Sequence, residues 1–322
     1  MKKIIALVIA LALCLTAFAA LADDVITVGV INNPPSESGY RAANVKDFED
    51  VFTAENGYEL KPFYSLEHDP QIAAAKDFIT EGVDYLLISA ASTDGWDATL
   101  EEAQAAGVKV LLFDRPINCN PDLYYAGVIS DMYKEGTMAV DWLVAQELPE
   151  YNVIHIQGVV TTGASQGRTA ALQAKFDDGS MNCVVQQAGD WSADKAYDIV
   201  SSVINAKTPF NVIYAENDDM ARGAIKALDD NNITHGVDGD VVVMGYDCVK
   251  ENMRQLLAGL QNYDGQCSPF QAKVLDDLIK KIEAGEDISG LLNENKQIIS
   301  DEKGFDAKTI TAEDVETYGL GD

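Results

Sequence analysis

The feature that most constrains the fold of this chain is a regular alternation of two kinds of segment. Short apolar runs rich in β-branched residues alternate with stretches in which apolar side chains recur at helical spacing, as at Ile72, Ala75 and Ile79. Continuous apolar strands that alternate with helices are typical of parallel sheets covered on both faces. We therefore predict an α/β protein. The expected strands are residues 25–31, 85–89, 108–113, 153–156, 183–187, 212–214 and 241–244.

Glycines mark the expected helix ends. Gly57, Gly82 and Gly107 each follow a helical stretch, where a residue in the left-handed conformation closes the last turn. The alternation of segments continues to the end of the chain, and a length of 322 residues corresponds to about two domains. The sequence therefore predicts two α/β lobes in succession.

The first 22 residues have the pattern of a secretory signal peptide. Lys2 and Lys3 precede an apolar run over residues 4–21, and Ala20-Leu21-Ala22 is a small-x-small cleavage signal. The run is long enough to span a bilayer as an uncleaved anchor. The abruptly acidic start that follows favours cleavage after Ala22. We therefore expect an exported protein, either periplasmic or associated with the cell surface.

The charge balance excludes some partners. Lys plus Arg is 23 against 52 for Asp plus Glu, a formal net charge of −29. A surface this acidic repels phosphate backbones and anionic lipid headgroups, so we expect no nucleic acid and no peripheral membrane binding. Three His and scattered Cys favour no metal site and no cofactor. After cleavage, disulfides and buried free thiols stay equally open for the remaining cysteines, Cys119, Cys183, Cys248 and Cys267.

Polar side chains gather after the expected strands. In open α/β sheets the ligand crevice lies beyond the carboxyl ends of the strands. Neither a phosphate-binding glycine loop nor a G-x-S-x-G nucleophile turn occurs in the sequence. The segments that follow the strands are Asn32-Asn33, residues 89–93, Asp114-Arg115, Gln157-Gly158, Asp190-Trp191, residues 216–218 and Asp247.

These residue types suit a neutral polyhydroxylated ligand. A sugar hydroxyl both donates and accepts a hydrogen bond, Asp accepts from adjacent hydroxyls, and Arg donates in a fork. The apolar C–H face of a sugar ring rests on an aromatic ring such as that of Trp191. The rim composition therefore indicates sugar binding.

At these strand ends the sequence resembles the periplasmic sugar-binding proteins of ABC importers, and most closely the ribose- and galactofuranose-binding group. The resemblance covers essentially the whole chain after residue 22. It implies the type I periplasmic binding protein fold, two Rossmann-like lobes with parallel sheets joined by a three-segment hinge. The matching segments, in family order, are SESGYRAA (36–43), Gly95-Trp96, LFDRPI (112–117), DWLV (141–144), GAS (163–165), GDW (189–191), AENDDM (215–220), GYD (245–247) and QCSP (266–269).

The resemblance also implies lobe boundaries and a site. The N-terminal lobe would comprise residues 23–129 plus 267–299, and the C-terminal lobe residues 130–266 plus 300–322. A monosaccharide, a pentose or hexose and possibly a furanose, would be held between the lobes of a monomer and delivered to ABC transporter permease subunits. The sugar-holding positions would be Glu37, Arg41, Asp114 and Arg115 in the first lobe, Arg168, Trp191, Asn217 and Asp247 in the second, and Gln266 at the hinge.

Three other functions compete with transport: a glycosidase, a repressor and a sugar sensor. An exported glycosidase could use Asp114 and Asp247 as its paired carboxylates. We expect Arg115 and Arg168 to keep these carboxylates ionised, which removes the general acid and favours a protein that is not an enzyme. A repressor with the same lobes is excluded by the signal peptide and the missing DNA-binding headpiece. A sugar sensor for a chemotaxis or signalling receptor stays compatible.

A few conspicuous side chains have simpler explanations. Trp142 and Met220 lie at helical apolar spacing and are expected to pack in the core. Trp96 is equally compatible with packing at a helix start and with the pocket rim. Solvated helix faces are expected for Glu101-Glu102 and Asp276-Asp277.

Overall fold

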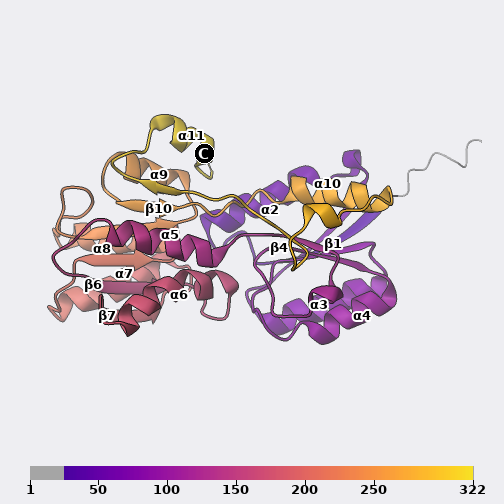
Figure 1. The fold of residues 1–322 in the computed structure, drawn as a ribbon, viewed down its shortest axis with the longest axis horizontal. Coiled ribbons are helices and arrows are strands. Elements are labelled where there is room, and N and C mark those ends of the chain that lie inside the picture. Colours follow the sequence, from indigo (N-terminus) through magenta and orange to yellow (C-terminus); the bar gives the residue numbers. More distant parts are fainter. Residues whose placement is uncertain (1–24, 322) are drawn as a thin grey trace, which may run out of the picture.

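The computed structural model describes residues 25–321, which form two lobes placed end to end (Figure 1). The N-terminal lobe is built on a six-stranded sheet of the described chain, in the order β11-β5-β4-β3-β1-β2, with every neighbouring pair parallel. Its strands are β1 (Ile26–Asn32), β2 (Tyr58–Tyr64), β3 (Tyr85–Ile88), β4 (Lys109–Asp114), β5 (Ala126–Ile129) and β11 (Gln297–Ile299).

The C-terminal lobe repeats this plan within residues 25–321. Its six strands follow the order β12-β10-β9-β8-β6-β7, and the edge strand β12 is antiparallel to β10 while the other pairs are parallel. The prediction of two α/β lobes with parallel sheets is confirmed. The strands are β6 (Asn152–Gln157), β7 (Asn182–Ala188), β8 (Val212–Ala215), β9 (Val242–Tyr246), β10 (Tyr263–Gly265) and β12 (Gly304–Asp306).

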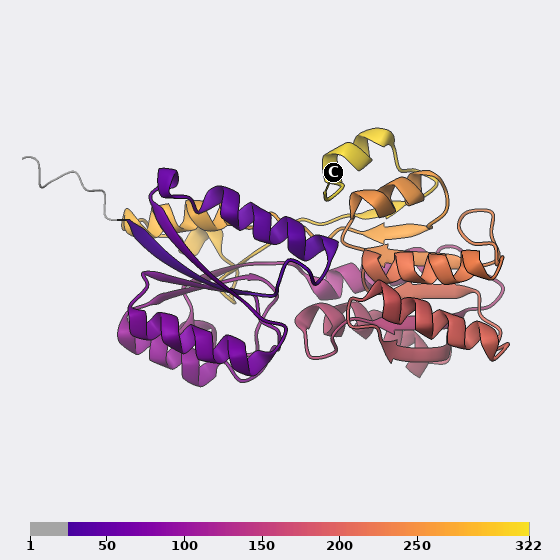
Figure 2. The same cartoon turned by 180° about the vertical axis from the view of Figure 1, so that it is seen from behind.

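Helices cover both faces of each sheet, as Figure 2 shows from behind. In the N-terminal lobe one core lies under α3 (His68–Glu81) and α4 (Asp97–Ala106). The opposite core lies under α2 (Gly39–Val51) and α10 (Ala272–Glu283). In the C-terminal lobe α7 (Ala193–Asn205) and α8 (Asp218–Asp230) cover one face.

The other face of the C-terminal sheet is covered by α5 (Met132–Val144) and α6 (Gly163–Asp177). The short helices α9 (Lys250–Leu257) and α11 (Ala312–Tyr318) enclose a small core of their own at the far side of this lobe. Continuous apolar strands between two helical layers account for the near-complete burial of strands such as β3.

All seven expected strands are present, and strands that the sequence analysis missed lie mostly at sheet edges. β2 reads YELKPFY, is half-exposed, and carries Lys61 and Pro62, which are typical of an edge strand. The expected glycine caps are confirmed, since Gly82 and Gly107 end α3 and α4 with φ of 74° and 80°. Gly57 closes a short 3-10 helix rather than α2.

Three crossings of the described chain join the lobes, along residues 130–131, 266–271 and 300–303. The crossings are bonded to one another by one carboxyl group. Ser130 Oγ of the first crossing donates to Glu302 Oε1 of the third at 2.7 Å. The backbone N–H of Ser268 in the second donates to the same oxygen at 2.9 Å.

The expected signal peptide, residues 1–22, lies outside the described residues. No helix in the described part is long and apolar enough to cross a membrane. All four cysteines of the described chain are free thiols, and the alternative of buried thiols holds for Cys248 and Cys267, whereas Cys119 is half-buried and Cys183 is exposed. Asp276 was wrongly expected on a solvated face: it is 3% exposed and accepts a hydrogen bond from the Tyr58 hydroxyl at 2.7 Å.

Candidate functional site

A small cavity of about 20 Å³ lies between the two lobes. It has room for about one water molecule, whereas small-molecule sites usually measure about 300–1,000 Å³, so the lobes must part to admit a ligand. Eight of the nine predicted site residues line it, and Gln266 is the exception. The lining residues are Glu37, Ser38, Tyr40, Arg41, Asp114 and Arg115 of the N-terminal lobe, and Ala164, Arg168, Trp191, Asn217 and Asp247 of the C-terminal lobe.

The cavity lies at strand ends whose backbone is unusual. Asp114 is the last residue of β4, and Asp247 directly follows β9. Asp114, Trp191 and Asp247 have φ of 61°, 64° and 100°, a left-handed region that side-chain-bearing residues rarely adopt. Such conformations cost roughly 1–3 kcal/mol each and persist at functional sites where the surrounding structure fixes them. The residues with these unusual backbone conformations therefore also line the cavity.

Arg41 organises the N-terminal side of the cavity. Ser38 caps α2 by accepting from the backbone N–H of Arg41, which fixes the first turn that carries this side chain. The guanidinium is fully buried; its Nη2 donates to Asp114 Oδ2 at 2.6 Å and its Nε to Glu37 Oε2 at 3.3 Å. Burial alone would raise the pKa of Asp114, but Arg41 and Arg115 hold it below its usual value. Asp114 is therefore a fixed, ionised acceptor.

Arg115 is held much more loosely. Its Cζ lies 5.9 Å from the centroid of the Trp191 ring. Its nearest carboxylates are Glu37 at 3.6 Å and Asp114 at 3.7 Å, beyond hydrogen-bonding distance. Within residues 25–321, Nε and Nη1 of Arg115 and Nε1 of Trp191 are buried without a hydrogen-bond partner. These three donors are available to a ligand.

Arg168 organises the C-terminal side. Its Nε donates to Glu135 Oε2 at 2.7 Å, its Nη1 to the Glu216 carbonyl oxygen at 2.5 Å, and its Nη2 to Asp247 Oδ1 at 3.1 Å. The expectation that Arg168 keeps Asp247 ionised is wrong, because burial outweighs the guanidinium and raises the pKa of Asp247 to about 8. A protonated Asp247 can both donate and accept.

Asn217 is the N-cap of α8. Its Oδ1 accepts from the backbone N–H of Met220 at 2.9 Å, which fixes the side chain. Its Nδ2 is buried and has no partner within the described chain. Gln266 lies in the second crossing, where its backbone N–H donates to the Lys303 carbonyl, and it is not among the residues that line the cavity.

Sequence reasoning missed Tyr40, Ser38 and Ala164. Tyr40 is the important omission, because its hydroxyl donates to Asp114 Oδ1 at 2.9 Å while its ring packs into the core of the opposite lobe. Its position between Glu37 and Arg41 on the first turn of α2 was the available signal. The open alternative for Trp96 is resolved in favour of packing, since it is fully buried in the core beside α4.

The lobes contact each other around the cavity. The backbone N–H of Gly39 in α2 donates to Asp219 Oδ2 in α8 at 3.0 Å. The backbone N–H of Thr93 donates to the Thr161 carbonyl oxygen at 3.2 Å. The described arrangement is therefore a closed one, in which side chains from both lobes face one small space.

Residues 28–287 match the periplasmic binding protein domain. The chain belongs to this family. The galactofuranose-binding protein YtfQ of Escherichia coli is 29% identical over 265 residues, which cover 80% of this chain and 81% of that protein.

Solved structures of the family agree. A Mycobacterium smegmatis protein in complex with β-D-fucofuranose superposes with a TM-score of 0.79 at 27% identity, over 88% of this chain and 92% of that one. The binding component of the arabinose ABC transporter from Shewanella sp. ANA-3, bound to α- and β-L-arabinofuranose, gives a TM-score of 0.80 at 25% identity, over 91% and 95% of the two chains.

Proposed function

We propose that this protein captures one neutral monosaccharide between its lobes and delivers it to an ABC transporter. The observation that carries the proposal is the set of buried donors around one cavity that lack partners within residues 25–321: Arg115 Nε and Nη1, Trp191 Nε1 and Asn217 Nδ2. A buried polar group without a hydrogen bond costs about 1–3 kcal/mol. A ligand that brings several acceptors between the lobes, with the lobes parted enough to admit it, removes this cost.

Sugar chemistry fits the remaining lining. The ionised Asp114 accepts from hydroxyls, and Asp247 with a pKa near 8 both donates and accepts at neutral pH. The face of Trp191 suits the apolar C–H side of a sugar ring. Support for a furanose comes from the galactofuranose-, fucofuranose- and arabinofuranose-binding relatives.

Both lobes hold the sugar. The first lobe comprises residues 23–129 plus 267–299, and the second comprises residues 130–266 plus 300–322. Glu37, Arg41, Asp114 and Arg115 hold it from the first lobe. Arg168, Trp191, Asn217 and Asp247 hold it from the second. Gln266, which does not line the cavity of the described form, would contact the sugar from the second crossing.

A non-enzymatic role is part of the proposal. Both Asp114 oxygens already accept strong hydrogen bonds, from Tyr40 on one side and from Arg41 and Ser89 on the other. A carboxylate engaged in this way is a poor base or nucleophile, so the paired-carboxylate chemistry of a glycosidase has one partner unavailable. The family and the relatives named above are binding proteins.

The proposal also covers location and partners. We infer export by the signal peptide with cleavage after Ala22, a monomeric protein in the periplasm or at the cell surface, and permease subunits as partners. A chemotaxis or signalling receptor is an alternative acceptor of the same closed form.

A thermal-shift screen tests the proposal. The purified protein is titrated with D-galactose, D-fucose, L-arabinose and D-ribose in turn. The comparison ligand is myo-inositol, a polyol that has no anomeric carbon. A bound sugar raises the melting temperature as its concentration increases, by RT ln(1 + [L]/Kd) in free energy. Recovery of the sugar unchanged, in one-to-one stoichiometry, supports binding without turnover. No shift with any mono- or disaccharide would contradict the proposal.

A further inference from the structure

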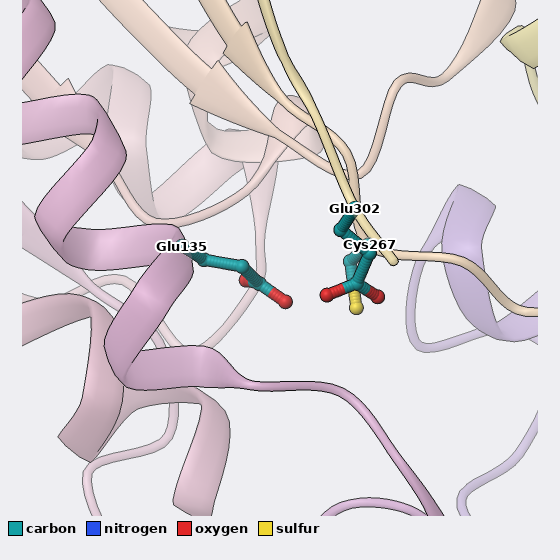
Figure 3. Close-up of side chains that lie close together, drawn as sticks. All are labelled: Glu135, Cys267 and Glu302. Atoms are coloured by element: carbon teal, nitrogen blue, oxygen red, sulfur yellow. The ribbon is translucent and has the colours of Figure 1, made fainter. Parts of the chain in front are cut away.

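Three buried side chains meet where the crossings join the lobes (Figure 3). Glu135 comes from α5, Cys267 from the second crossing and Glu302 from the third. They are 0%, 2% and 4% exposed, and one ligand atom from each lies within 4.8 Å of the others. Figure 3 shows the carboxyl group of Glu135 directed toward Glu302 and Cys267. The sugar site described above does not include this cluster.

Each carboxyl group is bonded on one side. Glu135 Oε2 accepts from Arg168 Nε at 2.7 Å, and Glu302 Oε1 accepts from Ser130 and Ser268. Glu135 Oε1 is buried and has no hydrogen-bond partner in the described part of the chain. A buried acceptor of this kind is costly unless a nearby group donates to it. The other carboxyl group of the cluster is that donor if it carries a proton.

Electrostatics places the proton on Glu302. Two adjacent buried carboxyl groups do not both ionise. The guanidinium of Arg168 donates a hydrogen bond to Glu135, whereas Glu302 accepts, within the described chain, only from a hydroxyl and a backbone N–H. Burial first, and then the charge of Glu135, raises the pKa of Glu302 to about 9. Cys267 is a neutral thiol at neutral pH, because burial together with Glu135 and Glu302 raises its pKa.

We propose that Glu302 is a positioning residue for sugar binding: as a neutral acid it donates to Glu135, which aligns Arg168 against Asp247 in the cavity. This inference rests on the proposed function. α5 packs against β10, which leads into the second crossing, and against β12, which follows the third. The cluster therefore stays together whether or not a sugar is bound, and Glu302 keeps its proton in both states.

The charged groups nearest to Glu302 either point away from its carboxyl group or are acidic. Asp301 and Lys303 flank Glu302 in sequence, but Asp301 pairs with Lys134 at 3.7 Å with a side chain 93% exposed, and Lys303 donates to the Tyr318 hydroxyl. Facing the Glu302 carboxyl are Glu135, with Arg168 on its far side, and Cys267. The negative charge of Asp114, on the cavity side of the cluster, also raises the pKa of Cys267. None of these supplies a cation directly to Glu302.

Raising the pH removes the proton of Glu302 near pH 9. Glu135 Oε1 then loses its donor and faces a second negative charge, so affinity falls as the pH rises through about 9 and levels off above it. Asp247 also titrates in the cavity, so the wild-type profile by itself is not decisive.

The test compares Glu302→Gln with the wild type. The amide of Gln mimics the protonated acid, since its oxygen accepts from Ser130 and Ser268 and its nitrogen donates to Glu135. We expect Glu302→Gln to match wild-type affinity within about twofold at pH 6, for the sugar with the largest thermal shift. The ratio of the wild-type Kd to the variant Kd should rise by about tenfold or more by pH 10, where most of the wild type has lost the proton. This ratio cancels the contribution of Asp247.

Two further variants separate positioning from folding. Glu302→Ala leaves Glu135 Oε1 unpartnered and should bind about tenfold more weakly than the wild type at pH 6, where the wild type keeps the proton. Asp301→Asn, next to it but exposed, should change nothing. A constant Kd ratio between pH 6 and 10, or wild-type affinity at pH 6 in Glu302→Ala, would overturn the proposal. So would Zn²⁺ stabilising the wild type but not Glu302→Gln, because the cluster would then bind a metal.

A sugar-independent measurement separates this proposal from the proposed function. At pH 7 the infrared difference spectrum of wild type minus Glu302→Gln should contain the carbonyl band of a protonated carboxyl group. Its presence without any sugar binding would mean that the proposed function has failed while Glu302 is protonated as inferred. Its absence would overturn the inference whatever sugars bind.

Discussion

Gly158 lies directly against the indole of Trp191: a Cβ atom at position 158 would come within 1.9 Å of the ring atom Cη2. The ring has no room to retreat, because Trp191 is 4% exposed and packs into the core of the C-terminal lobe. Glycine at position 158 is therefore required for the Trp191 ring to line the cavity.

Gly158→Ala is expected to displace the Trp191 ring into the cavity and to weaken sugar binding by at least tenfold. Overpacking of this kind also costs about 1–3 kcal/mol of stability. Isothermal titration calorimetry checks the affinity, and denaturant unfolding checks the stability.

Gly290→Ala is the matched control for Gly158→Ala, because a Cβ atom there meets nothing within 4 Å. It should leave both quantities unchanged. Wild-type affinity in Gly158→Ala would show that the ring position does not matter for binding.

Variants of the arginines should separate affinity from stability. Arg115→Ala removes donors that have no partner within residues 25–321, so we expect it to lose about tenfold or more in affinity with little change in unfolding free energy. Arg168→Ala breaks a buried pair with Glu135 and should lose about 3–5 kcal/mol of stability as well.

Asp114→Ala should resemble Arg168→Ala, because it leaves the fully buried Arg41 without its closest carboxylate. Urea unfolding of the three variants at one pH, alongside titration calorimetry, measures both effects. Equal destabilisation by Arg115→Ala and Arg168→Ala would contradict the different roles assigned to the two arginines.

Closure of the lobes around a sugar should be visible in solution. The lobes must part for a ligand to enter, a hinge motion of the kind known for periplasmic binding proteins. We expect small-angle scattering to give a smaller radius of gyration at saturating sugar. An unchanged radius would argue against hinge closure.

Tryptophan emission should report the same event locally. Trp191 lines the cavity and loses water on closure, whereas Trp142 donates to Asp306 at 2.6 Å and packs against Tyr263. Trp191→Phe should therefore abolish the fluorescence response to sugar, and Trp142→Phe should keep it. A full response in Trp191→Phe would remove that ring from the site.

Stability should fall as the pH rises, because a second buried carboxyl pair holds a proton. Burial raises the pKa of Asp264 to about 7 and that of Asp218 well above its usual value. Between about pH 4 and 7 the folded state keeps a proton that the unfolded chain releases, so the free energy of unfolding drops by roughly 1 kcal/mol per pH unit.

Asp264→Asn should remove this contribution and become relatively more stable than the wild type as the pH rises. Urea midpoints at pH 4.5 and pH 8 measure the difference, with the exposed Asp277→Asn as control. The prediction fails if Asp264→Asn and the wild type lose stability in parallel over this range.

The sequence was informative where a pattern is local. Apolar strands gave the sheets, and the polar residues after them include Asp114, Arg115, Trp191 and Asp247, which the fold brings to one cavity. The burial of a charged side chain is not encoded in any local sequence pattern. Asp276 looks like a surface residue in a run of charges, yet its position under Tyr58 depends on how α10 packs against β2.

Titration behaviour was the least predictable property. Asp114 and Asp247 both lie beside an arginine, yet Asp114 is ionised and Asp247 has a pKa near 8. The difference comes from the charges around each group. Both carboxyl groups are buried, but two arginines, Arg41 and Arg115, lower the pKa of Asp114. Asp247 has one arginine, and the carboxylates of Glu135, Asp219 and Asp264 raise its pKa further. Such surroundings are known only from coordinates. Glu302 also lacked any sequence signal, because its partners come from crossings far apart in the chain.

The late return of the chain to the first lobe constrains the order of biosynthesis. β5 ends at Ile129, but its outer neighbour β11 begins at Gln297, and α10 covers the same sheet from residue 272 onward. A nascent chain that has reached residue 265 therefore carries β5 with an unpaired edge and an uncovered apolar face, the features that promote aggregation. Completion of the N-terminal lobe therefore waits until residues 272–299 are available, long after its first strands have been made.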